Sequence, residues 1–312
     1  MTGAIHVIHE NPEWAAPLLR ALAERGLPHA DWCVIEHGFD LSAPPPEGVF
    51  YSRMSASAHT RGHRFSPEYA AGLLTWLEAK GARVVNGSQV LALELSKVAQ
   101  YAALARHGIR VPRTVPALGR RATLRAAESF AGPFIAKPNR AGKGLGVRLF
   151  QSVDELRAYL DGPEFATPVD GVMLLQQYIR APEPMITRVE FVGGTFMYAV
   201  RVDTSDGFEL CPADACTLPD TARPKFEIID GFESPLVPIY ERFLADNGIE
   251  VAGIEFIVDA DGTAYTYDIN TNTNYNPEAE ARAGVSGMDR LTRFLGRVLT
   301  EGTATPRQAV AG

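Results

Sequence analysis

Long apolar runs, cysteine and excess positive charge are all scarce in this chain of 312 residues. No stretch approaches the roughly 18 consecutive apolar residues of a membrane-spanning helix, which argues against a membrane protein. The three cysteines give no paired disulfide framework. Lys and Arg number 30 against 37 Asp and Glu, a net charge of -7, and no long basic run stands out. Nucleic acid is therefore not expected as the main partner, and an anionic ligand would need a local basic site.

The opening residues, MTGAIHVIHENPEW, lack the cationic start and long apolar core of a secretory signal peptide. Together with the few cysteines, this predicts a protein of the reducing cytoplasm. Hydrophobic residues make up 46% and charged residues 21%, an ordinary globular composition. The length fits two or three modest units with a core and a cleft.

The first 90 residues alternate strand-like and helix-like signals. Asn11-Pro12-Glu13 is typical of an N-cap, a proline at the first helical position and a first-turn acid. Ser66-Pro67-Glu68 repeats the pattern. Such β-α alternation predicts a small parallel α/β unit. Strands are expected at 4–10, 32–36, 48–53 and 82–87, and helices at 12–25 and 67–80.

Beyond residue 90 the signals are mixed, which predicts an α+β arrangement. Ser152 to Glu155 forms a capping box that opens a helix. The last dozen residues are expected to form a flexible tail. Helices are expected at 96–107, 153–160, 234–247 and 287–299, and strands at 172–179, 187–192, 195–202, 253–259 and 263–270.

A glycine-rich stretch, PFIAKPNRAGKGLGV, follows a short apolar strand that carries Lys137. Gly142, Gly144 and Gly146 alternate around Lys143, so backbone N–H groups can approach an anion closely. The spacing matches neither the P-loop nor the dinucleotide fingerprint. Phosphate binding and a plain glycine-rich hairpin therefore both remain open at this point.

A second stretch, GIEFIVDADGTAYTYDIN, predicts a hairpin with Asp261-Gly262 as its two-residue loop. That loop places Glu255 opposite Asp268, with Cβ atoms about 4.5–5.5 Å apart. A four-residue loop would shift the pairing but keep the same face. Asn270 lies two residues beyond Asp268 and so shares its face. Three oxygen-bearing side chains on one face suit Mg²⁺, the alternative being an exposed polar strand face.

Two further segments are unusual. YSRMSASAHTRGHRFSP concentrates basic residues after a strand end, and Arg53, Arg61 and His63 are candidate contacts for a substrate carboxylate. A cap over the cleft and a solvated loop are the alternatives. ELCPADACTLPD carries Cys211 and Cys216 at a spacing that matches no common zinc or redox motif.

These stretches together resemble the ATP-grasp superfamily, in particular its RimK-type carboxylate-amine ligases. The resemblance covers about residues 85 to 297, and the order of its five parts makes it specific. Lys97 opens the region, Lys137 and the glycine loop follow, then LLQQYIRAPE as a hinge, an arginine-bearing strand and the acid-hairpin-acid-x-Asn ending. Residues 1–84 resemble in layout the small Rossmann-like α/β domain that often precedes this fold. The implied division is 1–90, 91–175 with the glycine loop, 176–300 with the metal site, and the tail 301–312.

The resemblance implies a nucleotide site. Its members would bind ATP through two lysines, the glycine loop, the hinge and an acid at the ribose. In this chain those positions are Lys97, Lys137, Arg140, Gly142, Lys143, Gly144, Gly146, Gln176, Tyr178, Ile179 and Glu183.

The resemblance also implies the chemistry. Glu255, Asp268 and Asn270 would hold two Mg²⁺ ions against the phosphates. Lys137 and Arg201 are the expected catalytic residues, Arg201 stabilising an acyl phosphate and the tetrahedral intermediate. A carboxylate would attack the γ-phosphate to give an acyl phosphate and ADP, and an amine would then displace phosphate. Another phosphoryl-transfer reaction and a non-catalytic nucleotide-binding module are the alternatives.

The chain departs from the resemblance after Asn270. Related ligases commonly continue as Asn-x-Ser-Pro-Gly, whereas here the run is Asn-Thr-Asn-Thr-Asn. Asn272 stands where the serine would be, and with Arg188 it is a candidate substrate contact; an Asx-capped turn is the alternative. The expected partners are a small carboxylate and an amine. A peptide or carrier-protein acceptor and a homo-oligomer stay open.

Overall fold

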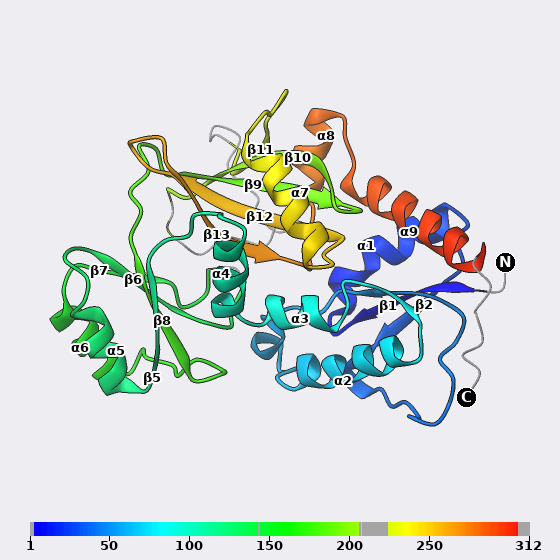
Figure 1. The fold of residues 1–312 in the computed structure, drawn as a ribbon, viewed down its shortest axis with the longest axis horizontal. Helices are drawn as coiled ribbons and strands as arrows, with labels where there is room; N and C mark the ends of the chain where they lie inside the picture. The colour runs from blue at the N-terminus through cyan, green and yellow to red at the C-terminus, as the bar shows by residue number, and fades with distance from the viewer. Residues whose placement is uncertain (1–2, 143, 206, 208–223, 305–312) are drawn as a thin grey trace.

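The computed structural model describes residues 3–142, 144–205, 207 and 224–304, and Lys143, Cys211 and Cys216 lie outside them. Within the described ranges the strands form three sheets (Figure 1). No helix of these ranges is long and apolar enough to cross a membrane. The domain boundaries expected from the sequence stay predictions, and the last helix runs on to Ala304, into the expected tail.

The first sheet is parallel and has the order β2-β1-β3-β4, which confirms the small parallel α/β unit. Helices α1 and α9 cover one face, and α2 and α3 cover the other (Figure 1). Asn11 caps α1 as the sequence predicts, its side chain accepting from two backbone N–H groups. The elements are β1 (Ala4–His9), α1 (Pro12–Glu24), β2 (His29–Cys33), β3 (Gly48–Ser52), α2 (Ser66–Ala79), β4 (Arg83–Val85), α3 (Ser88–Glu94) and α9 (Gly287–Ala304).

The position of β2 differs from the one that the sequence predicted. The apolar residues 32–36 suggested a strand, but β2 spans His29–Cys33, and Val34–Glu36 form a 3₁₀ turn. Among the described strands, β2 lies at the edge of the sheet and pairs with β1 alone. A strand with one neighbour needs no continuous apolar run, so hydrophobicity was a poor guide to its position.

The second sheet is antiparallel, with the order β5-β8-β6-β7. Helices α5 and α6 pack on it around Phe134, Phe150 and Leu156. Ser152 caps α6 as the capping box predicts, whereas α5, with four arginine or threonine residues among its eight, was not foreseen. The elements are β5 (Thr114–Leu118), α5 (Arg120–Ala127), β6 (Phe134–Pro138), β7 (Arg148–Phe150), α6 (Val153–Asp161) and β8 (Val172–Gln177).

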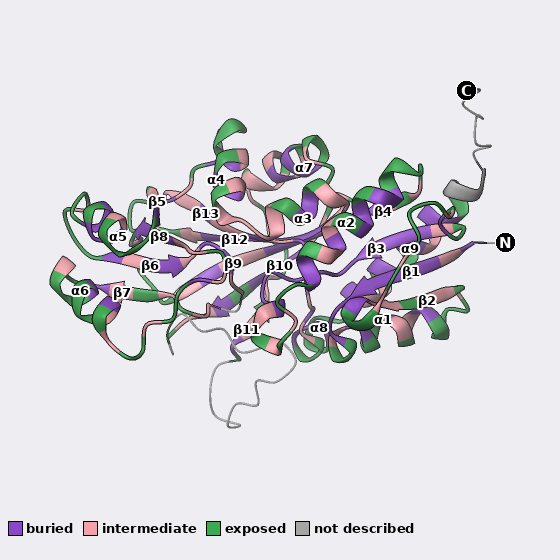
Figure 2. Ribbon diagram, turned by 90° about the horizontal axis from the view of Figure 1, so that it is seen from below, coloured by how far each residue is buried: buried purple, intermediate pink, exposed green. Residues whose placement is uncertain are grey.

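The third sheet, β11-β10-β9-β12-β13, lies between two apolar cores. One core includes residues of α4 and α7; the other is shared with the first sheet and α9, so the two sheets are packed into one body (Figures 1 and 2). Figure 2 shows the central strands β1 and β3 of the first sheet largely buried, and exposed residues along the outer faces of the helices. The elements are α4 (Lys97–Arg106), β9 (Met185–Val192), β10 (Thr195–Asp203), β11 (Phe226–Ile228), α7 (Leu236–Asp246), β12 (Val251–Val258), β13 (Ala264–Asn270) and α8 (Pro277–Ala283).

The β12–β13 hairpin confirms the expected pairing of Glu255 with Asp268, but a longer loop and a bulge produce it instead of the expected two-residue loop. The loop is longer than two residues, because Val258 pairs with Ala264. That register alone would place Glu255 opposite Tyr267. A bulge between Glu255 and Phe256 adds one residue on β13 and restores the Glu255–Asp268 pair. The bulge therefore decides which side chains share the face.

Candidate functional site

A cavity of about 590 Å³ lies between the second and third sheets, a volume typical of sites for small ligands and cofactors. Its walls come from the glycine loop, the segment that follows β8, and the β12–β13 hairpin. The residues that line it include Lys97, Lys137, Gly142, Gly144, Leu145, Gln176, Tyr178, Ile179, Glu183, Ile186, Glu255, Ile257, Tyr267 and Asp268.

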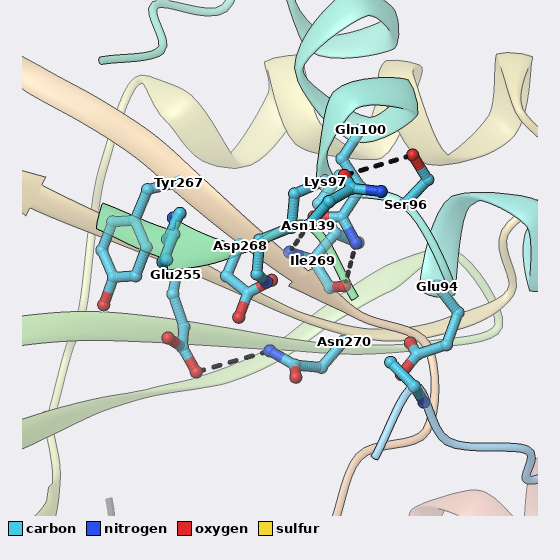
Figure 3. A network of polar contacts seen from close by, with 12 residues as sticks. Glu94, Ser96, Lys97, Gln100, Asn139, Glu255, Tyr267, Asp268, Ile269 and Asn270 are labelled. Carbon is cyan, nitrogen blue, oxygen red and sulfur yellow. Dashed lines mark hydrogen bonds and ion pairs between the residues drawn. The ribbon is translucent and has the colours of Figure 1, made fainter. Parts of the chain in front are cut away.

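Glu255 and Asp268 both line this cavity, and Figure 3 shows their side chains close to Lys97 and Asn270. Asn270 donates from Nδ2 to Glu255 Oε1 at 3.4 Å, so the amide lies on the face that the period-two spacing predicts. Lys97, at the start of α4, forms an ion pair with Asp268. Four groups from two distant parts of the sequence thus meet at one place.

Burial raises the pKa of Glu255, and the neighbouring Asp268 raises it further against the opposing effect of Arg188. Two carboxylates held together in a buried site repel unless positive charge is added. A divalent cation bound there would offset both the burial of Glu255 and its repulsion with Asp268. Across the part of the chain that the structure describes, no group of three or more His, Cys, Asp or Glu side chains could hold a metal ion. Glu255, Asp268 and Asn270 would therefore leave coordination positions to water or to a ligand.

Arg188 on β9 forms an ion pair with Glu255. Its Nη1 donates to Glu255 Oε1 at 2.9 Å, its Nε donates to Glu190 Oε1, and its Nη2 donates to Thr273 Oγ1 at 2.6 Å. Burial alone would lower the pKa of this guanidinium, but the two carboxylates outweigh burial and raise it. A Cβ on Gly253 would lie 2.4 Å from Arg188 Nη2, so the absence of a side chain there makes room for the guanidinium.

Lys137 on β6 is buried beneath the same cavity. Its Nζ donates to the Tyr101 hydroxyl at 2.7 Å and lies 5.8 Å from the centre of the Tyr267 ring. Burial, with a smaller contribution from Lys97, lowers the pKa of Lys137 to about 7. In the described residues no carboxylate is within ion-pair distance of it, so an anion entering the cavity would find an unneutralised cation.

The residues of the expected hinge line the cavity, and their contact with a nucleotide stays a prediction. Tyr178, Ile179 and Glu183 line it in the segment after β8. Gln176 also lines it, but its Nε2 donates to the Tyr101 hydroxyl at 3.0 Å and to Thr114 Oγ1 at 2.9 Å. Its amide orientation is therefore fixed by the protein.

The glycine loop is only partly turned toward the cavity. Gly142 and Gly144 line it, whereas the space beside Gly146 is taken by the ring of Pro138. Arg140 is buried and turned away: its Nη1 donates to Glu68 on α2 at 2.7 Å. The structure therefore does not bring Arg140 to the other phosphate-site candidates, because α2 supplies it with a carboxylate partner.

A smaller cavity of about 160 Å³ adjoins the first one. The two cavities share part of their lining, so they adjoin at these residues. The shared residues include Lys97, Gly142, Gly144, Glu255 and Asp268. The other residues of the second cavity include Trp14, Ser55, Ser57, Glu94, Arg188, Glu190, Tyr198, Val200, Val202, Asn270, Asn272, Asn274, Tyr275 and Asn276. All four alternate asparagines therefore border one space.

The basic segment after β3 is held by protein partners. Glu10 is buried, forms an ion pair with Arg61, and accepts from His63 Nδ1 at 2.9 Å. Arg61 also lies over the Trp14 ring, 4.4 Å from its centre. Arg53 donates to Asn272 and Asn274. None of the three basic residues lines either cavity.

Arg201 does not join the cluster. In the antiparallel register Val200 pairs with Arg188, so Arg201 lies on the opposite face of the sheet from Glu255. Its side chain is 46% exposed and its ion pair is with the exposed Glu227. The catalytic position that the resemblance implied for Arg201 is not supported by this placement, and Arg188 is the arginine that reaches the carboxylates.

Several site residues were missed by the sequence analysis. Glu190 lies two residues after Arg188 on one strand, so the period-two argument used for Asn270 would have found it. Glu94, Tyr101 and Trp14 carry no such signal, because only the packing of α1, α3 and α4 against the third sheet brings them near the cavities.

Comparison with known proteins gives three consistent findings. Residues 95–209 match the model of the RimK-like ATP-grasp domain. The chain is 28% identical over 110 residues to the alpha-aminoadipate–LysW ligase LysX of Sulfurisphaera tokodaii, covering 35% of this chain and 39% of that protein. It is 30% identical over 104 residues to the glutamate–LysW ligase ArgX of Sulfolobus acidocaldarius, covering 33% and 37%. The match thus spans about two fifths of these curated relatives.

Solved structures match over nearly the whole chain. The RimK domain protein ATP-grasp from Sphaerobacter thermophilus is similar with a TM-score of 0.66 and 20% identity, covering 94% of this chain and 99% of that one. The ATP-grasp ligase PsnB complexed with minimal precursor gives 0.69 and 17%, covering 96% and 100%. D-cycloserine synthetase DcsG gives 0.65 and 19%, covering 95% and 100%. At these identities the likeness establishes the fold, which agrees with the expected α/β class.

Proposed function

This chain carries a RimK-like ATP-grasp domain, and on that premise we propose that it is an ATP- and Mg²⁺-dependent ligase that joins a carboxylate to an amine. The observation that carries the proposal is the group formed by Glu255, Asp268, Asn270 and Lys97, which lies where the larger cavity meets the smaller one. A nucleotide in the larger cavity and a substrate in the smaller one would meet there.

The larger cavity suits the nucleotide. Lys97 and Lys137 supply positive charge at its inner wall, and backbone N–H groups of the loop at Gly142 and Gly144 are available for phosphate oxygens. Backbone groups at Tyr178 and Ile179 would contact the base. The apolar lining, which includes Ile186 and Ile257, is suited to a planar ring.

The oxygen-bearing side chains of Glu255, Asp268 and Asn270 fit Mg²⁺, for which we propose two ions as the resemblance implies. Bound there, Mg²⁺ would neutralise phosphate charge. The raised pKa of Glu255 supports this assignment, because a bound cation would offset the burial and the neighbouring Asp268 that raise it. Lys97 holds Asp268 in place and would be freed for a phosphate when a cation replaces it at the carboxylate.

The proposed reaction needs no covalent nucleophile on the protein. The substrate carboxylate attacks the γ-phosphate to form an acyl phosphate, and the amine then displaces phosphate. The protein's part is to position the reactants and to stabilise negative charge. Arg188 is suited to the second task, because its guanidinium is fixed between Glu190 and Glu255 and lines the smaller cavity.

The relatives' names indicate the kinds of substrate to try. LysX and ArgX are named as ligases of aminoadipate or glutamate with LysW, and PsnB as a ligase complexed with a precursor. We propose an amino acid or a peptide-like molecule for this chain, with a peptide or a carrier protein as an alternative acceptor. Glu183 is the proposed ribose contact.

The test is release of ADP and phosphate from ATP and Mg²⁺ against a panel of amino acids and amines. Asp268→Asn should lower the rate by about 100-fold or more, a loss of the size seen when one preorganised group that stabilises the transition state is removed. Asp154→Asn is the matched control, because Asp154 is 86% exposed on α6, and its rate should be unchanged.

The outcomes separate the alternatives. ADP and phosphate released only when an acid and an amine are both present support the ligase. ADP without free phosphate would instead indicate transfer to a stable phosphorylated product. Nucleotide binding with no hydrolysis for any pair, unchanged in Asp268→Asn, would refute both enzymatic functions.

A further inference from the structure

Arg53 is a buried cation, and the residues that the structure describes give it no carboxylate partner. The residue is 4% exposed, and within those residues its side chain donates to neutral oxygens. Nε donates to Asn272 Oδ1 at 3.1 Å, Nη1 to the Trp14 carbonyl at 3.0 Å, and Nη2 to the Thr273 carbonyl at 3.3 Å and to Asn274 Oδ1 at 2.5 Å. Buried charges are normally neutralised by a direct partner, and these hydrogen bonds supply none to the guanidinium of Arg53.

Arg53 also fixes the orientation of two amides. A guanidinium has donors and no acceptor, so Asn272 and Asn274 must each turn the oxygen toward it. Each Nδ2 then faces away from the guanidinium. Neither nitrogen donates to a protein group among the residues described, and neither is a fully buried unpartnered atom. Since both residues line the smaller cavity, their N–H groups are available there.

The acidic groups of this cavity, by contrast, are already bound. Glu190 accepts from Arg188 and from the Thr273 hydroxyl at 2.8 Å. Glu94 accepts from the backbone N–H of Thr271 at 2.7 Å and from that of Ala56 at 3.2 Å. A ligand therefore meets unused donors on the asparagine side of the cavity rather than unused acceptors.

We propose that Asn272 and Asn274 bind a carboxylate of the substrate in the smaller cavity, and that Arg53 is the positioning residue that orients and polarises their amides. The carboxylate is one that does not react, because the two asparagines line only the smaller cavity, whereas Lys97, Glu255 and Asp268 lie at the junction with the larger one. This proposal rests on the proposed ligase function, because that function makes the bound molecule a substrate.

The hydrogen-bonding chemistry of the two amides and the volume of the smaller cavity both fit a carboxylate. An amide whose oxygen accepts from a guanidinium becomes a stronger donor through its nitrogen, so the charge of Arg53 acts on the ligand through the amides. The cavity of about 160 Å³ resembles in volume the roughly 150 Å³ cavity that accommodates benzene. It therefore suits a group of a few heavy atoms, such as the carboxylate end of an amino acid or of a peptide.

The experiment measures binding without nucleotide, so that its outcome is separate from turnover. Propionate and its neutral isostere propionamide are titrated into the full chain at constant ionic strength, with ligand-detected NMR as the readout. We expect propionate to bind at least 10-fold more tightly than propionamide, the effect of a charge-assisted hydrogen bond. L-alanine and Gly-Gly-L-Ala, as competitors, distinguish a free amino acid from a peptide end.

Asn274→Asp is the key variant. The aspartate keeps an oxygen for Arg53, so the fold should be retained, but it replaces the N–H donor by a negative charge. Propionate affinity should fall by about 10- to 100-fold while propionamide affinity changes little. Arg53→Gln should reduce the preference for propionate in the same direction. Gln151→Glu adds the same charge at an exposed position outside both cavities, and it should bind both probes as the wild type does.

Three results would overturn the inference. They are equal or absent binding of the two probes by the wild type, an Asn274→Asp variant that still prefers propionate as strongly, and an Asn274→Asp variant that loses both probes equally. If the probes behave as expected but no acid-amine pair supports ADP release, the carboxylate site stands and the proposed ligase function fails.

Discussion

Lys137 should couple nucleotide binding to proton uptake. Its pKa is lowered to about 7 by burial and by Lys97. At pH 8 only about one tenth of a group with this pKa is protonated. Phosphate oxygens near Nζ favour the charged form, so binding should draw the proton back. We expect uptake of about 0.9 proton at pH 8 and about 0.1 at pH 6.

The assay is isothermal titration calorimetry with ADP and Mg²⁺ in buffers of different ionisation enthalpy. The nucleotide and the carboxylates of Glu255 and Asp268 exchange protons as well. The proton uptake measured for Lys137→Met is therefore subtracted from that of the wild type. Asp268, Glu255, Lys97 and the hydroxyl of Tyr101 surround this lysine and stay in place in the variant. A difference near zero at pH 8 would refute the lowered pKa or the phosphate contact.

The same lysine should make the unliganded fold more stable as the pH rises. Its folded pKa lies below its ordinary value of 10.5, so the unfolded chain binds the proton more tightly between about pH 7 and 10.5. The free energy of unfolding should therefore increase across that window, by at most about 1.4 kcal/mol per pH unit from this group. Chemical denaturation should show the increase in the wild type and a smaller slope in Lys137→Met.

Three further predictions concern the arginines of the third sheet. Arg188→Met leaves Glu190 and Glu255 without their shared cation, so the free energy of unfolding should fall by about 3–5 kcal/mol; a loss below 1 kcal/mol in urea denaturation would contradict this. Gly253→Ala should cost about 1–3 kcal/mol, because the added methyl group meets the Arg188 guanidinium, and circular dichroism melts that match the wild type would show that the guanidinium moves aside easily. Arg201→Ala should leave both stability and ADP release close to wild type, since the side chain is exposed on the other face; a large loss of turnover would restore its expected catalytic role.

Local patterns predicted most of the elements that build the site. The proline and cap signals located α1 and α2, although Ser66 is the first residue of α2 and not its cap. β-branched and aromatic runs located four strands of the third sheet, and the three-residue β11 was missed. The short polar helices α5 and α8 were missed because they lack an apolar period. In α8, Asn276 proves to be the N-cap, its side chain accepting from the Ala279 N–H at 2.7 Å, which gives the last asparagine of the alternating run a structural role.

The sequence by itself determined the order of the motifs, and through the period of two it placed Asp268 and Asn270 on one face, whereas the bulge in the hairpin decided that Glu255 faces them. Spacing along a strand fixes direction, so such neighbours can be read from the chain. Only the tertiary structure decided which arginine reaches the carboxylates, because that depends on the register of β9 and β10. It alone brought Arg53 to Asn272 and Asn274, more than 200 residues later in the chain. A contact between distant segments leaves no local pattern, since packing rather than periodicity makes it.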